Sequence, residues 1–480
     1  MSDASRKTVT EPPVELGEPP TNGGSGTALA EEHPLSTKSP AVVPAHKLPI
    51  PIVVGTRPEA IKLVPVILAL RESEHYEPIV VSTGQHHKMV QFIFELAGIS
   101  TDVQLRAGVR RSDLNERVST VLRRFEDFCA DRFELIEDGS PPRAKDIIAG
   151  DYPIAVMVHG DTSSAMAAAL AAFHLHIPVL HVEAGLRTGG LNLSPFPEEL
   201  NRQLISAIAS LHFAPTSQNL QNLVRENIDA DQIFVTGNTG IDALRWASTL
   251  DVRSADPELN RVMEGDARVV VVTAHRRENW GSGLAAIAEA VARLAGKHPE
   301  TRFVVPVHPN PEVAATVRGR LEGVDNILLV EALGYAVFAK LLGRCDLVIT
   351  DSGGIQEEAP SLNKPVLVTR ESTERLEGIT AGTLKLVGTD PELIVAEAER
   401  LLTDPVAYAQ VAEAQNPYGD GTGAERIVAC LEHLLVGGTP PTQFGPGYTR
   451  AAVARAAGFD GDGEVAAELY GSQPYADREA

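Results

Sequence analysis

The residues best suited to chemistry stand where a strand-like run breaks into a glycine turn and then into a helical pattern. The apolar run 347–350 is followed by Asp-Ser-Gly-Gly (351–354) and then by Ile-Gln-Glu-Glu. Such a turn presents backbone N–H groups and a hydroxyl at a helix N-terminus, where phosphate oxygens bind well. Glu358, one turn into the helix, is placed to accept hydrogen bonds from sugar hydroxyls. Alone, the stretch fits a tight strand-to-helix turn better than a binding site. Together with the motifs below, it predicts a site for a nucleotide diphosphate.

Three carboxylates follow apolar runs in the first half of the chain. Asp161 comes after the run 154–159, Glu183 follows the run 179–182, and Glu198 follows Ser-Pro-Phe-Pro. In open α/β sheets ligands bind beyond the carboxyl ends of the strands, so we expect these side chains at one edge. A lone Asp at this position more often caps a helix, but capping does not explain three carboxylates. Convergent carboxylates raise one another's pKa and can divide acid and base roles near neutral pH.

Cationic and imidazole side chains follow other apolar runs. Arg57 and Lys62 belong to the turn after the first run, although helix capping explains that turn equally well. His275 is followed by two arginines, and His308 comes after a neighbouring run. A lone His is more often structural, but an imidazole beside guanidinium groups suits an anionic ligand or a leaving diphosphate. We expect both histidines on the same sheet edge as Ser352 and Arg375.

The elements that must position these groups are short apolar runs that alternate with longer helical stretches. Runs nearly continuous in Val, Ile and Leu, separated by helices, indicate parallel sheets covered on both faces. Two doubly wound α/β domains are therefore predicted, with the break near 237–240, after the run 233–236. The other predicted strands are Ile50–Val54, Ile79–Ser82, Ile154–His159, Val179–Val182, Val269–Thr273, Phe303–Val307, Leu347–Thr350 and Val366–Val368.

Composition limits the possible partners and compartments. The chain has 480 residues, which favours two domains plus tails, and a net charge of −22, which argues against nucleic acid or an anionic membrane as a partner. Its three cysteines are widely separated, and no apolar run approaches the roughly 20 residues of a membrane span, so a cytoplasmic protein is expected. The Pro- and Gly-rich residues 1–47 read as a disordered tail and 438–480 as a mostly irregular extension.

Motifs for common cofactors and metals are missing from the sequence. There is no Gly-x-Gly-x-x-Gly fingerprint after a strand, no Walker loop and no paired Cys or His spacing typical of a metal site. Neither a cofactor nor a metal ion is therefore expected.

Eight motifs in order closely resemble the non-hydrolysing UDP-N-acetylglucosamine 2-epimerases, over about residues 48–436. The motifs are Gly-Thr-Arg-Pro-Glu-Ala-Ile-Lys (55–62), His-Gly-Asp-Thr (159–162), His-Val-Glu-Ala-Gly-Leu-Arg-Thr-Gly (181–189), Ser-Pro-Phe-Pro-Glu-Glu-Leu-Asn-Arg (194–202), Thr-Gly-Asn-Thr (236–239), His-Arg-Arg-Glu-Asn (275–279), Asp-Ser-Gly-Gly-Ile-Gln-Glu-Glu-Ala-Pro-Ser (351–361) and Asn-Pro-Tyr-Gly-Asp-Gly (416–421).

The resemblance implies a glycosyltransferase-B architecture with the active site in the cleft between two Rossmann-like domains. These would span 48–237 and 238–422, with a C-terminal helix at about 423–437 completing the first. It also implies a homodimer that interconverts UDP-N-acetylglucosamine and UDP-N-acetylmannosamine. In that family UDP is eliminated to give a 2-acetamidoglucal and is then added back after the C2 proton returns on the other face.

Site residues carry over from the family position by position. The catalytic positions correspond to Asp161, Glu183, Glu198 and His275. The UDP-binding positions correspond to Arg57, Lys62, His308, Ser352, Gly353, Gly354, Glu358 and Arg375. Within the second set, the resemblance implies that Ser352 and Gly354 contact phosphate and that Glu358 contacts ribose.

The sequence departs from the family pattern in three places. Leu376 stands where a proline is common, which alters the turn that carries Arg375. The loop 188–195 is one residue longer than usual, which can shift Glu198. A possible effector segment comprises Gln85, His86 and His87, and His87 replaces the usual arginine. That replacement puts activation by a second UDP-N-acetylglucosamine in question.

Three other functions compete with this prediction. A hydrolysing epimerase would release UDP and free N-acetylmannosamine, although the Pro-Glu pair at 58–59 favours the non-hydrolysing branch. A glycosyltransferase could use the same fold, which by itself does not decide function. A silent nucleotide-sugar binding protein is the alternative from a different class.

Overall fold

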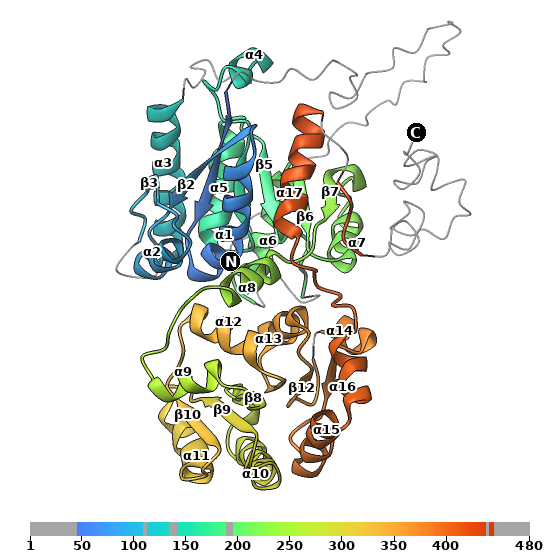
Figure 1. Ribbon diagram of the computed structural model, residues 1–480. Helices are drawn as coiled ribbons and strands as arrows, with labels where there is room; N and C mark the ends of the chain where they lie inside the picture. The colour runs from blue at the N-terminus through green and yellow to red at the C-terminus, as the bar shows by residue number, and fades with distance from the viewer. Residues whose placement is uncertain are drawn as a thin grey trace, which may run out of the picture. The chain divides into compact units, whose positions relative to one another are not determined.

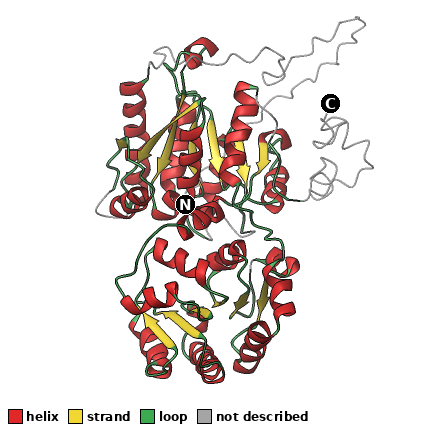
Figure 2. Cartoon of the chain, in the orientation of Figure 1, coloured by secondary structure: helices red, strands yellow, loops and turns green. Residues whose placement is uncertain are grey.

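The structure is a computed structural model that describes residues 46–108, 113–133, 142–188, 195–373, 375–437 and 441–445. The predicted tail 1–47 and extension 438–480 lie outside these residues, apart from 46–47 and 441–445. Two parallel sheets with helices on both faces make up the described chain (Figures 1 and 2). None of the described helices is long and apolar enough to cross a bilayer.

The first sheet has the strand order β3-β2-β1-β4-β5-β6-β7, with every pair parallel. From β1 the chain adds strands toward one edge of the sheet, and from β4 it adds them toward the other edge. The topological switch point therefore lies between β1 and β4, as in a Rossmann fold. Its strands are β1 Leu48–Val54, β2 Tyr76–Ser82, β3 Val103–Gln104, β4 Val156–His159, β5 Val179–Val182, β6 Leu211–Ala214 and β7 Ile233–Val235. The associated helices are α1 Arg57–Glu72, α2 His87–Leu96, α3 Leu114–Arg132, α4 Ala144–Ile148, α5 Ser163–His174, α6 Glu198–Ile208, α7 Ser217–Arg225, η1 Ala230–Gln232 and α8 Thr239–Ser248.

The second sheet repeats the pattern with the order β10-β9-β8-β11-β12-β13. Its strands are β8 Val269–Thr273, β9 Arg302–Pro306, β10 Ile327–Val330, β11 Leu347–Thr350, β12 Val366–Val368 and β13 Leu384–Leu386. Its helices are α9 Pro257–Glu264, η2 Arg277–Asn279, α10 Ser282–Lys297, α11 Pro311–Leu321, α12 Tyr335–Arg344, α13 Gly353–Glu358, η3 Ala359–Leu362, α14 Leu376–Ala381, α15 Pro391–Thr403 and α16 Pro405–Ala412.

Each sheet buries an apolar layer on both of its faces. On β1, Ile52 and Val54 pack toward α1, whereas Val53 points to the opposite layer, which contains Phe125 of α3. This is the alternation expected of a strand with side chains at period two. Helix α17 (Gly423–Leu431), the last α-helix of the described residues, packs its Ile427 against the α1 side of the first sheet, and the π-helical turn η4 (Glu432–Val436) follows.

The predicted strands are present, with small changes at their ends. The run 154–159 forms a strand only from Val156, and the run 233–236 ends at Val235. Four short strands, β3, β6, β10 and β13, had not been predicted. β3, β10 and β13 are edge strands that bury few of their positions, and polar residues interrupt the apolar pattern in some of the four. Examples are His212 in β6 and Lys385 in β13.

Candidate active site

Several of the predicted site residues follow the strands at the two switch points, and others, such as Glu183 and His308, follow the neighbouring strands β5 and β9. In the first sheet the switch-point strands are β1 and β4, and the residues after them include Arg57 and Asp161. In the second sheet they are β8 and β11, which lead to His275 and Ser352. Ligands of open α/β sheets bind beyond the carboxyl ends of strands at such switch points. The topology thus places both halves of the predicted site where this class of fold binds ligands.

Glu183 is a partly buried carboxylate held in an uncommon backbone conformation. It follows β5 with φ of 64°, in the left-handed region that L-residues seldom occupy. Its Oε2 pairs with Nζ of Lys62, and Nε2 of His159 lies 3.6 Å away. Burial alone would raise the pKa of Glu183, but Lys62 and His159 lower it well below its usual range. Burial also lowers the pKa of His159 to about 4. At neutral pH the site therefore holds an ionised Glu183 beside a neutral imidazole.

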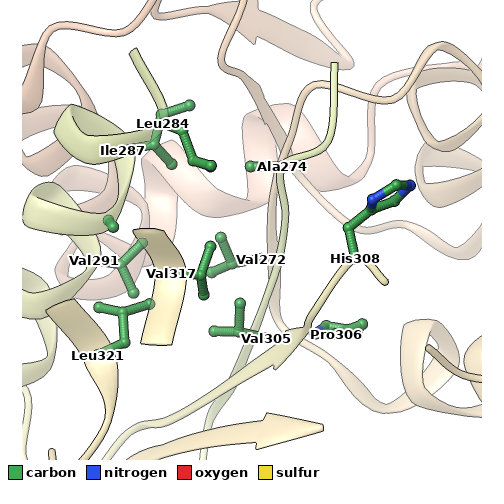
Figure 3. Close-up of a pocket in the computed structure, with 11 residues that line it drawn as sticks. Val272, Ala274, Leu284, Ile287, Val291, Val305, Pro306, His308, Val317 and Leu321 are labelled. Carbon is green, nitrogen blue, oxygen red and sulfur yellow. The ribbon is translucent and has the colours of Figure 1, made fainter. Parts of the chain in front are cut away.

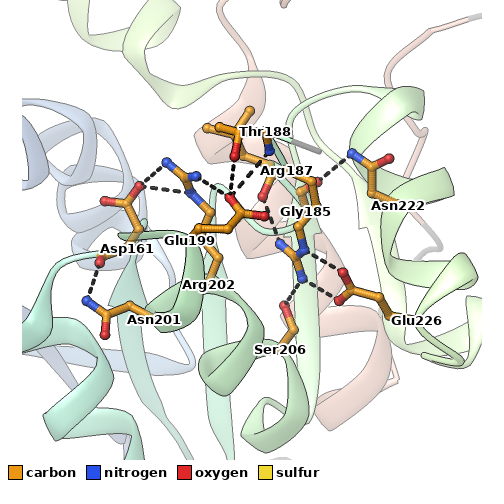
Figure 4. A network of polar contacts seen from close by, with 11 residues as sticks. Asp161, Gly185, Arg187, Thr188, Glu199, Asn201, Arg202, Ser206, Asn222 and Glu226 are labelled. Atoms are coloured by element: carbon orange, nitrogen blue, oxygen red, sulfur yellow. Dashed lines mark hydrogen bonds and ion pairs between the residues drawn. The ribbon is translucent and has the colours of Figure 1, made fainter. Parts of the chain in front are cut away.

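Asp161 belongs to a second group of charges, which is centred on Arg202 of α6 (Figure 4). Arg202 donates to Asp161 Oδ2 from Nε at 3.0 Å and from Nη2 at 2.6 Å, and to buried Glu199 from Nη1 at 2.7 Å. Burial raises the pKa of Asp161, as do nearby Glu183 and Glu198, whereas Arg202 opposes the change. Glu183 and Glu198 thus act on Asp161 as expected for convergent carboxylates, but the mutual rise in pKa predicted from the sequence does not extend to Glu183, whose pKa is lowered.

The N-cap of α5 is Thr162 and not Asp161. Thr162 Oγ1 accepts from Ala165 N at 3.0 Å and donates to Glu59 at 2.7 Å. Helix capping, the alternative explanation for Asp161, is thus performed by the neighbouring Thr162. Glu59 also accepts from Gly55 N and Thr56 N at 3.0 and 2.6 Å, so a single buried carboxylate joins the β1–α1 turn to the start of α5. It holds the two sides of the first switch point together.

Buried Asp351 organises the second switch point. Its carboxylate accepts from the backbone N–H groups of His275 at 2.9 Å and Arg276 at 2.8 Å, and from Asn279 Nδ2 at 3.1 Å. The rings of His275 and His308 stack with centroids 5.9 Å apart. Burial lowers the pKa of His275, and His308 and Arg276 add to this effect against the opposing Asp351. Asp351 therefore fixes the loop that carries His275, whose lowered pKa leaves its imidazole mainly neutral at pH 7.

Two guanidinium groups lie over the start of α13. A Cβ placed on Gly353 would approach Arg276 Nη2 to 3.2 Å and Arg375 Cζ to 3.4 Å, so only glycine leaves this space open. Arg375 precedes Leu376, the first residue of α14, and its Nε donates to Glu357 at 2.9 Å. Ser352 is the N-cap residue of α13 but makes no side-chain capping hydrogen bond. Charge-assisted hydrogen bonds from guanidinium groups are well suited to phosphate oxygens.

Lys62 connects the two groups of predicted residues. Although burial lowers its pKa, Glu183 raises it more strongly, and Glu357 and Glu358 of α13 add to the rise. Asn238, which precedes α8, donates from Nδ2 to Glu357 at 2.8 Å. Burial and Glu357 raise the pKa of Glu358 to about 7, against the opposing Lys62. Residues that follow strands of both sheets therefore surround one ammonium group.

Some predicted residues are not joined to these groups. Arg57 is exposed at the first position of α1, and no hydrogen bond or ion pair links it to the rest of the described site. In the effector segment, Gln85 Oε1 accepts from Ser164 Oγ at 2.8 Å, while His86 and His87 are exposed. His87 lines an open surface hollow of about 580 Å³ beside α2. The lengthened loop before Glu198 lies largely outside the described residues.

A small internal void beneath the second switch point is too small to hold a nucleotide. Its volume is about 10 Å³, near that of a single water probe. Aliphatic side chains such as Val272, Leu284 and Val305 line it, and the imidazole of His308 points away from them (Figure 3). It is a packing gap between the sheet and its covering helices. Among the described residues, no group of three or more His, Cys, Asp or Glu is arranged to hold a metal ion.

Comparison with known proteins decides the family. A family described as UDP-N-acetylglucosamine 2-epimerase matches residues 142–432. The chain is 45% identical over 389 residues to the UDP-N-acetylglucosamine 2-epimerase of Salmonella typhimurium, across 80% of this chain and 98% of the relative. It is also 45% identical to that of Bacillus subtilis, across 81% and 95%. The chain belongs to the UDP-N-acetylglucosamine 2-epimerase family.

A solved structure extends this likeness to the fold. The UDP-GlcNAc 2-epimerase from Neisseria meningitidis, bound to UDP-GlcNAc, is 38% identical and matches with a TM-score of 0.71, across 80% of this chain and 99% of that one. The family predicted from the eight motifs is confirmed, and so is the predicted α/β fold with two Rossmann-like sheets. The roles predicted for individual residues stay predictions.

Sequence reasoning missed several residues that shape this epimerase-family site. Arg202, Glu199, His159 and Asp351 stood inside quoted motifs but had been given no role. The i,i+3 spacing of Glu199 and Arg202 on one helix was a usable signal, because such residues are neighbours on a helix surface. Nothing local marked Asp351 as an acceptor for the His275 loop, since its donors lie more than 70 positions away in sequence.

Proposed function

We propose that the chain interconverts UDP-N-acetylglucosamine and UDP-N-acetylmannosamine without hydrolysis. The observation that carries this proposal is the position of Lys62 between Glu183, which follows the first sheet, and Glu357 and Glu358 of α13. The predicted catalytic carboxylate Glu183 thus lies near α13, where Arg375 pairs with Glu357 and is suited to bind phosphate. The Neisseria relative, whose structure holds UDP-GlcNAc, supports the same choice of nucleotide sugar.

The reaction needs both a carboxylate and a cationic group because the C2 proton is not activated by a carbonyl. In the proposed elimination a carboxylate takes this proton, the C1–O bond breaks with its electron pair leaving on UDP, and a C1=C2 double bond forms. Arg276 and Arg375 stabilise the negative charge that develops on the departing diphosphate. In the return step a proton is added to the opposite face of C2, and a UDP oxygen attacks C1. The C2 configuration is thereby inverted.

Asp161 and Glu183, two of the predicted catalytic carboxylates, differ in the way expected of a proton carrier and a permanent ion. Burial displaces the pKa of Asp161 upward, whereas Lys62 and His159 hold the pKa of Glu183 low. Carboxylates whose pKa values are pushed apart can take different acid–base roles. We assign proton exchange at C2 to Asp161 and an ionised, orienting role to Glu183. Glu198 and His275 are proposed as further catalytic groups, and Ser352, Gly354 and His308 as contacts of UDP.

Nuclear magnetic resonance of the purified protein with UDP-N-acetylglucosamine in deuterated water tests this function. The expected result is deuterium at C2 of both UDP-sugars at equilibrium, with no free sugar. Free N-acetylmannosamine together with an equal amount of UDP would instead establish the hydrolysing reaction. Absence of C2 exchange, with UDP binding retained, would favour the silent binding protein.

Nucleotide-sugar affinity is expected to rise with pH through the titration of Glu358. Its pKa of about 7 in the free protein should fall when ribose hydroxyls donate to the carboxylate, because such bonds favour the ionised form. Binding therefore strengthens as the pH rises toward about 7 and levels off above that value. Calorimetric titration with UDP-N-acetylglucosamine, in an Asp161→Asn background that prevents turnover, measures this. Glu358→Gln should remove the dependence, and an unchanged slope in that variant would rule out Glu358 as its source.

A further inference from the structure

A short segment beyond the last helix docks on the open edge of the first sheet. Strand β7 is the outermost strand of that sheet. Phe444 N donates to Val235 O at 2.8 Å, and Val235 N donates to the side-chain Oε1 of Gln443 at 3.3 Å. Residues 441–445 thus satisfy backbone groups that an edge strand would otherwise leave unpaired. We call these five residues the C-terminal strap.

The aromatic ring of the strap packs in an apolar cluster that includes the residue next to Glu183. Phe444 is only 6% exposed and packs in a cluster with Leu223 of α7 and Val235 of β7. The same cluster contains Ala184, the residue directly after Glu183. Burial of this apolar ring favours the docked position of the strap.

Arg426 of α17 joins the strap to both chain connections between the two sheets. Its Nε donates to Thr442 O at 3.0 Å, and its guanidinium lies 5.5 Å from the Phe444 ring centroid. Its Nη1 also donates to Thr236 O at 3.1 Å, at the end of β7, where the chain leaves the first sheet. On the returning connection, Asp420 accepts from Nη1 and Nη2 at 2.7 and 2.6 Å.

These connections reach the predicted diphosphate site directly. Asn238 N donates to Tyr418 O at 2.9 Å, which ties the outgoing connection to the returning one. Asn238 also donates to the Glu357 side chain, and Asn416 Nδ2 donates to the Glu357 backbone oxygen at 3.1 Å. Glu357 in turn holds Arg375. A continuous set of contacts therefore runs from Phe444 to the guanidinium group of Arg375 over α13.

We propose that the C-terminal strap is a positioning element, which clamps the two inter-sheet connections through Phe444 and Arg426 and thereby sets the placement of Asn238 and Glu357. The site beside β7 is thus occupied by the chain's own residues 441–445. The strap's effect on substrate binding rests on the proposed function, but its effect on the connections does not.

Two truncations of the full chain, compared with wild type, test the strap. A chain ending at Gly437 lacks it, whereas a chain ending at Gly445 keeps it and serves as the matched control. Hydrogen exchange followed by mass spectrometry should show exchange at 233–240 and 416–426 rising at least about tenfold in the shorter chain alone. The KM for UDP-N-acetylglucosamine should rise about fivefold while kcat changes less than about twofold, because positioning affects binding more than chemistry.

Point variants separate positioning from general instability. Phe444→Ala should reproduce the shorter truncation, and Phe444→Leu, which restores apolar burial, should recover most of the protection. Unchanged exchange at Val235 in the chain ending at Gly437, or equal changes in both truncations, would overturn the proposal. Changed exchange in a protein that shows no epimerisation at all would leave the strap standing and count against the proposed function instead.

Discussion

Replacing Asp161 by Asn is expected to lower the rate of epimerisation by about a thousandfold while UDP affinity stays within a few-fold of wild type. Asparagine cannot take or return a proton, and positioned acid–base groups contribute about 10²- to 10⁴-fold to such reactions. The substitution preserves the shape of the side chain, and Arg202 keeps its ion pair with Glu199. The rate of deuterium entry at C2 and calorimetric titration with UDP are the two measurements.

The matched control for this prediction is Asp325→Asn. Asp325 is exposed before β10, and Arg302 contacts only its backbone oxygen. This variant should have wild-type turnover. Undiminished turnover in Asp161→Asn would remove Asp161 from the proton path, and lost UDP affinity would show that the substitution had damaged the site as a whole.

Replacing Lys62 by Met should destabilise the protein by about 3 kcal/mol near neutral pH, because removing one partner of a buried ion pair strands the other charge. The side chains of Lys62 and Glu183 are 25% and 19% exposed, so some hydration of the carboxylate remains and the cost stays at the lower end of this range. Denaturant unfolding in guanidinium chloride measures it. The double variant Lys62→Met/Glu183→Gln should recover most of the loss, because it leaves no buried charge.

The pH dependence of that loss follows from the two shifts. Glu183 has a lowered pKa in the folded state, so its contribution is present above its ordinary value of 4.5 and fades as the pH falls below it. Lys62 has a raised pKa, so its contribution is present below 10.5 and fades above that value. The stability difference between wild type and Lys62→Met should therefore be largest between these limits and narrow outside them. A difference that stays level in acid would mean that the pair does not hold Glu183 ionised.

How far sequence reasoning reached depended on whether the relevant physics was local. Runs such as Val269–Thr273 are continuous in β-branched residues, and the structure buries all five positions. The strand Val103–Gln104 has two residues, neither of them buried, and leaves no comparable pattern. The same distinction applies to the site. Asp161 could be predicted from its place after a strand, but its partner Arg202 lies 41 positions away and became evident only in the fold.

Glu59 shows the limit of local reasoning most clearly. In sequence it is an acidic residue in the first turn of a helix, where it favours the helix dipole. In the structure it is fully buried and accepts a hydrogen bond from Thr162, 103 positions further along the chain. Its role as the joint of the first switch point comes from tertiary contacts alone.

The backbone conformation of Glu183 lowers the stability of the fold at a residue that we propose is needed for activity. A non-glycine residue at φ of 64° costs on the order of 1 kcal/mol, and that cost persists only where the surroundings enforce it. A descendant of this chain relieved of selection for catalysis would gain stability by drifting to glycine or asparagine at position 183, once Lys62 had also become uncharged. The pair of positions 62 and 183 would then record the loss of activity in the sequence before the fold itself had changed.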